Sequence, residues 1–140
     1  MKASTLVLVA IHYLGLASAA SIASPDGIVE NLEIRKCFAT GEKYGIEKGE
    51  AFAAARQACN GPLKGTYSKR ETRVRCYNIG RNKQVKLTVG LTGKNAGSTR
   101  TIGSDECYNG LSKEISNCEK GGDTTYGNWR YRADPNNGLC

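Results

Sequence analysis

Residues 71–92 read ETRVRCYNIGRNKQVKLTVGLT, and this alternating stretch is the strongest structural signal in the chain. In residues 84–92, the apolar side chains fall on one face, at Val85, Leu87, Val89 and Leu91. Residues 71–79 alternate as well, and Gly80-Arg81-Asn82-Lys83 separates the two runs. Alternation with a period of two is typical of strands. Two such runs joined by a short polar segment with a glycine predict a β-hairpin.

A helix is expected on each side of this hairpin. Before it, from about Ile46 to Cys59, apolar residues recur at helical spacing, and Asn60-Gly61-Pro62 ends the helix. After it, a polar loop over residues 93–103 leads to a second helix, whose apolar stripe is Cys107, Leu111, Ile115 and Cys118. We expect Ser104 to cap this helix at its start and Gly121-Gly122 to end it.

Two further strands complete the expected fold. A short one lies at Ile34 to Ala39, and another runs from about Thr124 to Ala133, before a turn at residues 134–138. The order of strand, helix, strand, strand, helix, strand is that of a split βαβ unit. The sequence therefore predicts an α+β fold: a single-domain α/β sandwich in which two helices cover one face of an antiparallel sheet.

Residues 1–19 have the layout of a secretory signal peptide, with Lys2, an apolar run at residues 6–11 and the small residues Ala17-Ser18-Ala19. Residues 20–140 are then the secreted cysteine-rich domain. An even number of cysteines in a small exported chain indicates a disulfide framework. We expect three intramolecular disulfides and no free thiol, with no preference for any one pairing, among Cys37, Cys59, Cys76, Cys107, Cys118 and Cys140.

Charge and the absence of histidine restrict the function. The formal net charge is +7, which favours anionic partners such as acidic glycans, cell walls, lipid surfaces or nucleic acid, although a positive charge can also serve solubility alone. The single histidine, His12, lies in the expected signal peptide. Without histidine or free thiols, the common nucleophilic systems are excluded, so we expect no enzyme, no metal and no cofactor. A hydrolase that uses only carboxylates is the alternative, but no spacing singles out a pair.

The C-terminal part carries a resemblance to a known group. Cys118-Glu119-Lys120-Gly121-Gly122 is followed by Asn128-Trp129-Arg130-Tyr131-Arg132 and then by Asp134-Pro135-Asn136-Asn137-Gly138-Leu139-Cys140. This pattern resembles small secreted cysteine-rich proteins of filamentous fungi, which include effector candidates of plant pathogens and proteins similar to a fungal glycan-binding lectin. The strand order also resembles that of the α/β-sandwich killer toxins.

Two functions follow from the resemblance and the composition. The first is a secreted, non-catalytic binding protein, effector-like or lectin-like, whose partner is a host extracellular protein or a glycan. The alternative is a killer-toxin-like or antimicrobial protein that acts on membranes or channels. We expect neither nucleic-acid binding nor stable membrane insertion, and a homodimer through the open sheet is a further alternative.

The open face of the sheet is the predicted binding surface. We expect it to carry Arg73, Arg75, Tyr77, Arg130 and Arg132, together with Lys86 and Thr88. Arginine and tyrosine side chains on a flat sheet can hydrogen-bond a sugar or an anionic chain. The opposite, core face is expected to hold Val74, Val85, Leu87, Val89, Trp129 and Tyr131. A merely solvated strand face is the alternative, and the loop at residues 93–103 is the next candidate surface.

Overall fold

The computed structural model describes residues 36–140. The expected signal peptide at residues 1–19 and the start of the expected first strand lie outside the described residues. The elements are η2 (Gly45–Glu47), α2 (Lys48–Cys59), β1 (Gly65–Ser68), β2 (Thr72–Asn78), β3 (Lys83–Leu91), β4 (Thr99–Ile102), α3 (Ser104–Asn117), β5 (Gly122–Tyr126) and β6 (Trp129–Asn137).

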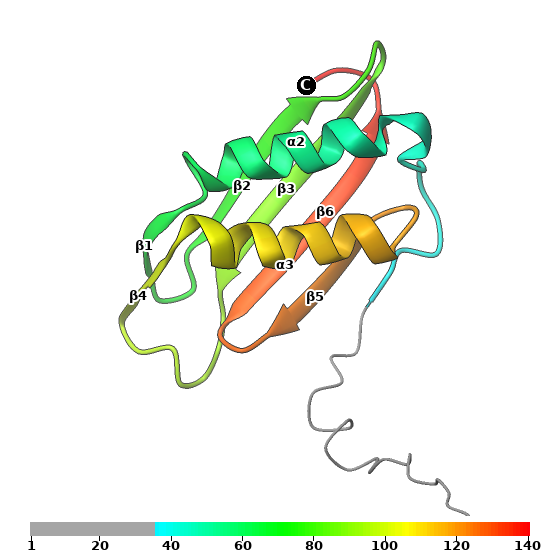
Figure 1. The fold of residues 1–140 in the computed structure, drawn as a ribbon. Helices are drawn as coiled ribbons and strands as arrows, with labels where there is room; N and C mark the ends of the chain where they lie inside the picture. The colour runs from blue at the N-terminus through cyan, green and yellow to red at the C-terminus, as the bar shows by residue number, and fades with distance from the viewer. Residues whose placement is uncertain (1–35) are drawn as a thin grey trace, which may run out of the picture. The chain divides into compact units, whose positions relative to one another are not determined.

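The main sheet has four antiparallel strands in the order β2-β3-β6-β5, and both helices cover the same face of it (Figure 1). The predicted fold class is therefore confirmed. The hairpin and both helices also lie where the sequence predicts them. Of the expected first strand, the described part forms only an isolated bridge, in which Cys37 pairs with Gly122 beside β5.

A small second sheet was not predicted. β1 and β4 pair antiparallel, from Gly65 opposite Ile102 to Ser68 opposite Thr99. Residues 99–102 fall in the predicted loop over residues 93–103, and residues 65–68 carry no predicted element. Each strand has only four residues, and most of their side chains are polar. Their two inward side chains, Tyr67 and Ile102, are buried and anchor this small sheet on the core.

The C-terminal region is a hairpin where the sequence predicts one strand and a turn. β5 and β6 flank Gly127, whose φ of 62° is a left-handed conformation that suits glycine. β6 then continues through Pro135 to Asn137. Proline is tolerated at position 135 because the pairing of β6 with β5 stops at Ala133. On the β5 side of Pro135, no strand of the described residues is present that would need a hydrogen bond from a backbone N–H.

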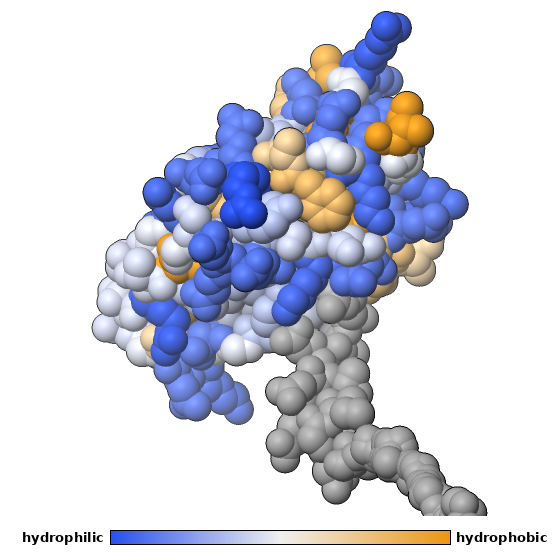
Figure 2. Space-filling model, viewed as in Figure 1, coloured by the Kyte–Doolittle hydropathy of each residue, from blue (hydrophilic) through white to orange (hydrophobic). Residues whose placement is uncertain are grey.

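The core lies between the sheet and the two helices, and the helix side of the molecule is mostly hydrophilic on its surface (Figure 2). The predicted core residues Val85, Leu87, Val89, Trp129 and Tyr131 are buried. The prediction for Val74 is wrong, because its side chain is 47% exposed. The register pairs Arg73 with Val89 and Tyr77 with Val85, and directly opposed residues of antiparallel strands share a face.

Three disulfides form, as predicted, and they use all six cysteines. The pairs are Cys37–Cys118, Cys59–Cys107 and Cys76–Cys140. The expected cap of α3 is different: Gly103 occupies the N-cap position, and the Ser104 hydroxyl donates instead to the carbonyl of Cys59 at 3.0 Å. That bond and the Cys59–Cys107 disulfide join the end of α2 to the start of α3.

Within residues 36–140, no helix has both the length and the apolar character that a membrane crossing requires.

Two helical glycines allow a sharp test of the packing. A Cβ added at Gly110 of α3 would overlap the ring of Tyr131, whereas a Cβ added at Gly49 of α2 meets no atom within 4 Å. We expect Gly49→Ala to raise the free energy of unfolding by about 0.5–1 kcal/mol through helix propensity. Gly110→Ala should instead lower it by about 1–3 kcal/mol through overpacking. Urea unfolding with the disulfides intact measures both, and equal stability of the two variants would contradict the close helix–sheet contact.

Candidate functional site

The structure separates the five predicted site residues into two groups. Arg130 and Arg132 lie on the open face of the sheet, as expected. The expectation that Arg73, Arg75 and Tyr77 share that face is wrong, because they lie opposite the core residues Val89, Leu87 and Val85. A shift of one residue in an alternating strand moves every side chain to the other face. The predicted surface is therefore not assembled by the fold.

Arg73 is engaged in holding the chain together. Its guanidinium lies 3.9 Å from the centre of the Tyr67 ring. It donates to the Glu71 carboxylate at 2.6 Å and to the carbonyls of Thr66 at 2.7 Å and Lys64 at 3.1 Å. It thus fastens β1 to β2. Of the other two predicted residues on this side, Tyr77 packs against the core and Arg75 is exposed.

On the open face, Arg130 and Arg132 alternate with two carboxylates. Arg130 donates to Asp123 at 2.8 Å and Arg132 to Asp134 at 2.8 Å, and Arg132 also lies 3.5 Å from Asp123. The Arg132 guanidinium lies 4.8 Å from the centre of the Phe38 ring. These contacts satisfy the arginines internally, so a ligand on this face would have to compete with existing ion pairs.

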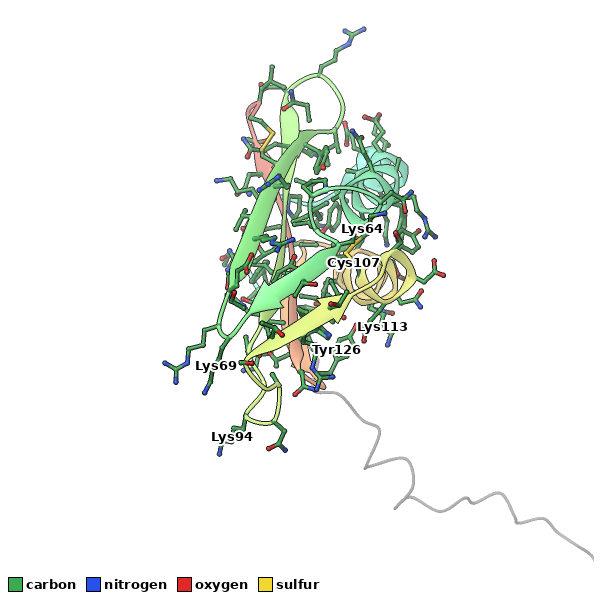
Figure 3. The ribbon with its side chains drawn as sticks, turned by 90° about the vertical axis from the view of Figure 1, so that its left-hand side faces the viewer. Lys64, Lys69, Lys94, Cys107, Lys113 and Tyr126 are labelled. Atoms are coloured by element: carbon green, nitrogen blue, oxygen red, sulfur yellow. A yellow bond between two sulfur atoms is a disulfide. The ribbon has the colours of Figure 1, made fainter. Side chains whose placement is uncertain are left out.

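A concave site lies instead at one end of the sheet. We call it the aromatic hollow: a pocket of about 450 Å³ between α3, β4 and the β5–β6 turn. Three rings line it, from Tyr126, Trp129 and Tyr131. Its polar lining comes from Arg100 on β4, from Glu106, Asn109 and Lys113 on α3, and from Asn128 in the turn. Figure 3 looks onto this side of the domain, with Lys113 and Tyr126 labelled.

Close packing gives the aromatic hollow its shape. The ring of Tyr131 lies directly against Gly110, and the centres of the Tyr126 and Tyr131 rings are 4.9 Å apart. Trp129 is held from behind by Tyr67, in an edge-to-face contact with 5.1 Å between ring centres. The Lys113 ammonium lies 4.7 Å from the centre of the Tyr126 ring. The rings are thus fixed before any ligand arrives.

Several polar groups around the aromatic hollow keep their bonding capacity. Among residues 36–140, the side chains of Glu106, Asn109 and Asn128 make no hydrogen bond to another residue. A carboxylate accepts hydrogen bonds, an amide both donates and accepts, and a guanidinium such as that of Arg100 donates. Rings beside such groups suit a ligand with an apolar face and many hydroxyls. A sugar ring has this chemistry.

A pocket of about 500 Å³ lies at the other end of the sheet, and most of its charged groups are already bonded within the domain. Glu50 accepts from the backbone N–H of Gly80 at 2.6 Å, and Lys83 donates to Glu47 at 3.1 Å. No aromatic side chain lines this pocket. Within the described part of the chain, no three His, Cys, Asp or Glu side chains gather into a metal site.

The aromatic hollow has no clear signal in the sequence. Trp129 and Tyr131 are predicted only as core residues, and the turn at Gly127-Asn128 is not predicted. The loop at residues 93–103 is the next predicted surface, and Arg100 from that segment lines the aromatic hollow. The remaining signal is the cluster of aromatic residues around a Gly-Asn turn at residues 126–131.

The ion pairs of the open face predict a pH-dependent stability. The hydrogen bond from Arg130, with the charges of Arg130 and Arg132, lowers the pKa of Asp123 from its ordinary 3.8. A carboxyl group with a lowered pKa in the folded state stabilises fully above its unfolded pKa, and this contribution is lost as the pH falls through the folded pKa. We expect Asp123→Asn to lower the free energy of unfolding by about 1 kcal/mol at pH 7, since the pair is partly exposed.

The difference in the free energy of unfolding between the wild type and Asp123→Asn should shrink as the pH falls below 3.8, because the carboxylate of Asp123 in the wild type then becomes protonated. Chemical unfolding from pH 7 to pH 2 measures it. Glu119→Gln is the control, since Glu119 is 73% exposed and pairs with Lys43 only at 3.6 Å. Its effect should stay within about 0.5 kcal/mol. A difference for Asp123→Asn that is the same at both ends of the pH range would refute the pairing.

Comparison with known proteins adds an independent observation. A family model described as "Glycan binding domain Y3" matches residues 50–140, from the first turns of α2 to the last residue. Every residue that lines the aromatic hollow lies within this range. No curated protein matches the chain.

Proposed function

Because this chain belongs to the glycan binding domain Y3 family, we propose that it is a secreted, non-catalytic protein that binds a glycan in the aromatic hollow. The observation that carries the choice of site is the combination of three packed rings with polar side chains whose bonding capacity is unused. Ligand sites are generally concave and combine apolar walls with a few well-placed polar groups. The aromatic hollow has both properties.

Each part of the aromatic hollow has a role in this proposal. The partly exposed ring of Tyr126 gives a sugar an apolar surface to pack on, and the buried rings of Trp129 and Tyr131 form the wall behind it. Asn109 and Asn128 offer both donors and acceptors to sugar hydroxyls, while Glu106 accepts and Arg100 donates. These residues come from α3, β4 and the β5–β6 turn, so their relative positions depend on the fold and not on one flexible loop. Such preorganisation reduces the cost of binding.

The open face is a weaker site for the same ligand. There, Arg130 and Arg132 already bond Asp123 and Asp134, and breaking these pairs would offset the energy of new contacts. It still serves as the alternative, because an exposed Val74 and an exposed Lys86 stand beside the ion pairs. Substitution at Lys86 therefore distinguishes the two surfaces.

The proposed location is outside the cell. The expected signal peptide at residues 1–19 and the three disulfides support it, since disulfides persist in oxidising compartments. An extracellular glycan, on a host surface or in a wall, is then the proposed partner. If the bound glycan belongs to a host, the proposed role is an effector-like interaction with that host. A panel of host and fungal glycans shows which of the two the protein binds.

The site is tested by binding to a panel of immobilised glycans, followed by titration of the best binder in solution. Trp129 is the single tryptophan of the chain and lines the aromatic hollow, so its fluorescence reports ligand entry. We expect Asn109→Ala and Arg100→Ala each to weaken binding about tenfold, the value of one lost hydrogen bond to a polar ligand. Both positions are exposed, so the variants should fold normally.

The control is Lys86→Ala on the open face, which should keep the wild-type affinity. Loss of binding in Lys86→Ala, with full binding in the two hollow variants, would place the site on the open face. Absence of any bound glycan in the panel would refute the proposed function. Mass spectrometry of the bound glycan after incubation should show no cleavage, and cleavage would contradict the non-catalytic assignment.

A further inference from the structure

A second, smaller concavity lies beside the aromatic hollow. We call it the basic hollow: a pocket of about 240 Å³ between the β1–β2 turn and the segment that follows β3. Its charged lining consists of Lys69, Arg70 and Lys94, and the rest is Leu91, Thr92, Gly93 and Ala96. No carboxylate lines it. Three cations therefore line one space, which is large enough to admit a sulfate or carboxylate group.

The three cations of the basic hollow line one concavity, and within residues 36–140 none of them has a counter-ion. Some other arginines and lysines of the described residues pair with carboxylates: Lys43, Arg56, Arg73, Lys83, Arg130 and Arg132. Among the residues that the structure describes, exposed cations such as Arg75 and Lys86 form no such pair, but they do not line this concavity. In the part of the chain that the structure describes, Lys69, Arg70 and Lys94 form no such pair. The nearest carboxylate in sequence, Glu71, is bound by Arg73 and by the backbone N–H of Ser68. Unpaired cations around a concavity concentrate positive potential there.

The two turns that carry these cations are held in place by the backbone. Lys69 donates its N–H to the carbonyl of Ser98 at 2.8 Å, which ties the β1–β2 turn to the segment before β4. Arg70 has a φ of 66°, a left-handed conformation that is uncommon for a residue other than glycine. The turn thus keeps an arginine where glycine or asparagine would fit with less strain.

The basic hollow and the aromatic hollow share a wall. The backbone N–H groups of Thr92 and Gly93, in the basic hollow, donate to the carbonyl of Asn128, in the aromatic hollow, at 2.9 and 3.4 Å. Arg100 of the aromatic hollow bonds the carbonyl of Ala96 at 3.5 Å. Figure 3 shows Lys69, Lys94 and Tyr126 toward the same end of the domain. One extended ligand can therefore reach both concavities.

We propose that the basic hollow binds an anionic substituent, a sulfate or a carboxylate, of the glycan whose neighbouring ring occupies the aromatic hollow. This inference rests on the proposed function, and it narrows the ligand to acidic glycans. Sulfate and carboxylate share the chemistry that lysine and arginine recognise, since both are anionic acceptors of several hydrogen bonds. A neutral glycan would occupy the aromatic hollow alone and leave the three cations solvated.

The first measurement compares one core glycan in three forms: N-acetyllactosamine, its 6′-sulfated form and its sialylated form. We expect at least one acidic form to bind about tenfold more tightly than the neutral form at low salt, because several partly exposed ion pairs add together. The preference should decline as ionic strength rises, since salt screens exposed charges. The two acidic forms distinguish sulfate from carboxylate as the recognised group.

The variant that tests the basic hollow combines Lys69→Ser, Arg70→Asn and Lys94→Ser, with asparagine chosen because it tolerates the left-handed conformation. It should abolish the preference for the acidic form. The matched control combines Arg75→Ser, Arg81→Ser and Lys86→Ser, which removes the same charge from other exposed positions and should keep the preference. If both triple variants lose the preference for the acidic glycan equally, the attraction is a general one for polyanions, and the proposal is overturned. Competition by a DNA oligonucleotide that is as strong as that by the acidic glycan would overturn it as well.

A second measurement does not depend on the choice of core glycan. Methyl sulfate and acetate are titrated separately into the protein, and the backbone amide resonances are followed by NMR. Saturable shifts at residues 69–70 and 92–96, absent from the triple variant at Lys69, Arg70 and Lys94, are expected with at least one of the two anions. Shifts that never saturate, or that spread evenly over all exposed lysines and arginines, would overturn the basic hollow. If these shifts occur while no glycan binds, the proposed function fails and the anion site stands.

Discussion

The pairing of β3 with β6 is the constraint on which the rest of the structure depends. It runs without interruption from Lys83 opposite Asn137 to Leu91 opposite Trp129. Because the two strands are antiparallel and in full register, the end of β3 and the start of β6 lie side by side. The segment after β3 and the turn before β6 must then meet, and the bonds from Thr92 and Gly93 to Asn128 are the result. Both hollows lie where these segments meet, at the end that Figure 1 draws lowest.

The preorganisation of this end comes from covalent and steric restraints that act together. The Cys59–Cys107 disulfide and the Ser104 hydroxyl fix the first turn of α3, and the next turns of α3 supply Asn109 and Lys113 to the aromatic hollow. Gly110 lets α3 approach β6 until the helix touches the Tyr131 ring. A larger side chain would push the helix away and separate the polar groups from the rings. Stability and recognition therefore depend on the same contact.

The parts of the fold that the sequence predicts are those with local signals. The alternation over residues 84–92 is by itself enough to predict a strand. The apolar stripe from Cys107 to Cys118 is likewise enough to predict a helix. β1 and β4 contain none, because their pairing joins residues more than thirty positions apart, such as Thr66 and Thr101. The face of β2 is mistaken for a related reason. Val74 and Cys76 are apolar and look like core, but the edge position of β2 leaves one of its faces partly exposed, and the register with β3 decides which one. The aromatic hollow needs Arg100, Asn109 and Asn128 to come together from three elements, and only the folded chain shows this.

The three disulfides have one further property in common. Each joins a cysteine that precedes residue 92, namely Cys37, Cys59 or Cys76, to one that follows residue 98, namely Cys118, Cys107 or Cys140. All three disulfides therefore span the segment between β3 and β4. If a protease cut this segment, the two parts of the domain would remain joined by three covalent bonds. Lengthening such a segment costs little, since loop-closure entropy grows slowly with length. The exposed positions of this stretch can thus vary more freely than its buried Ala96, which allows one rigid frame to acquire new ligands while its core stays the same.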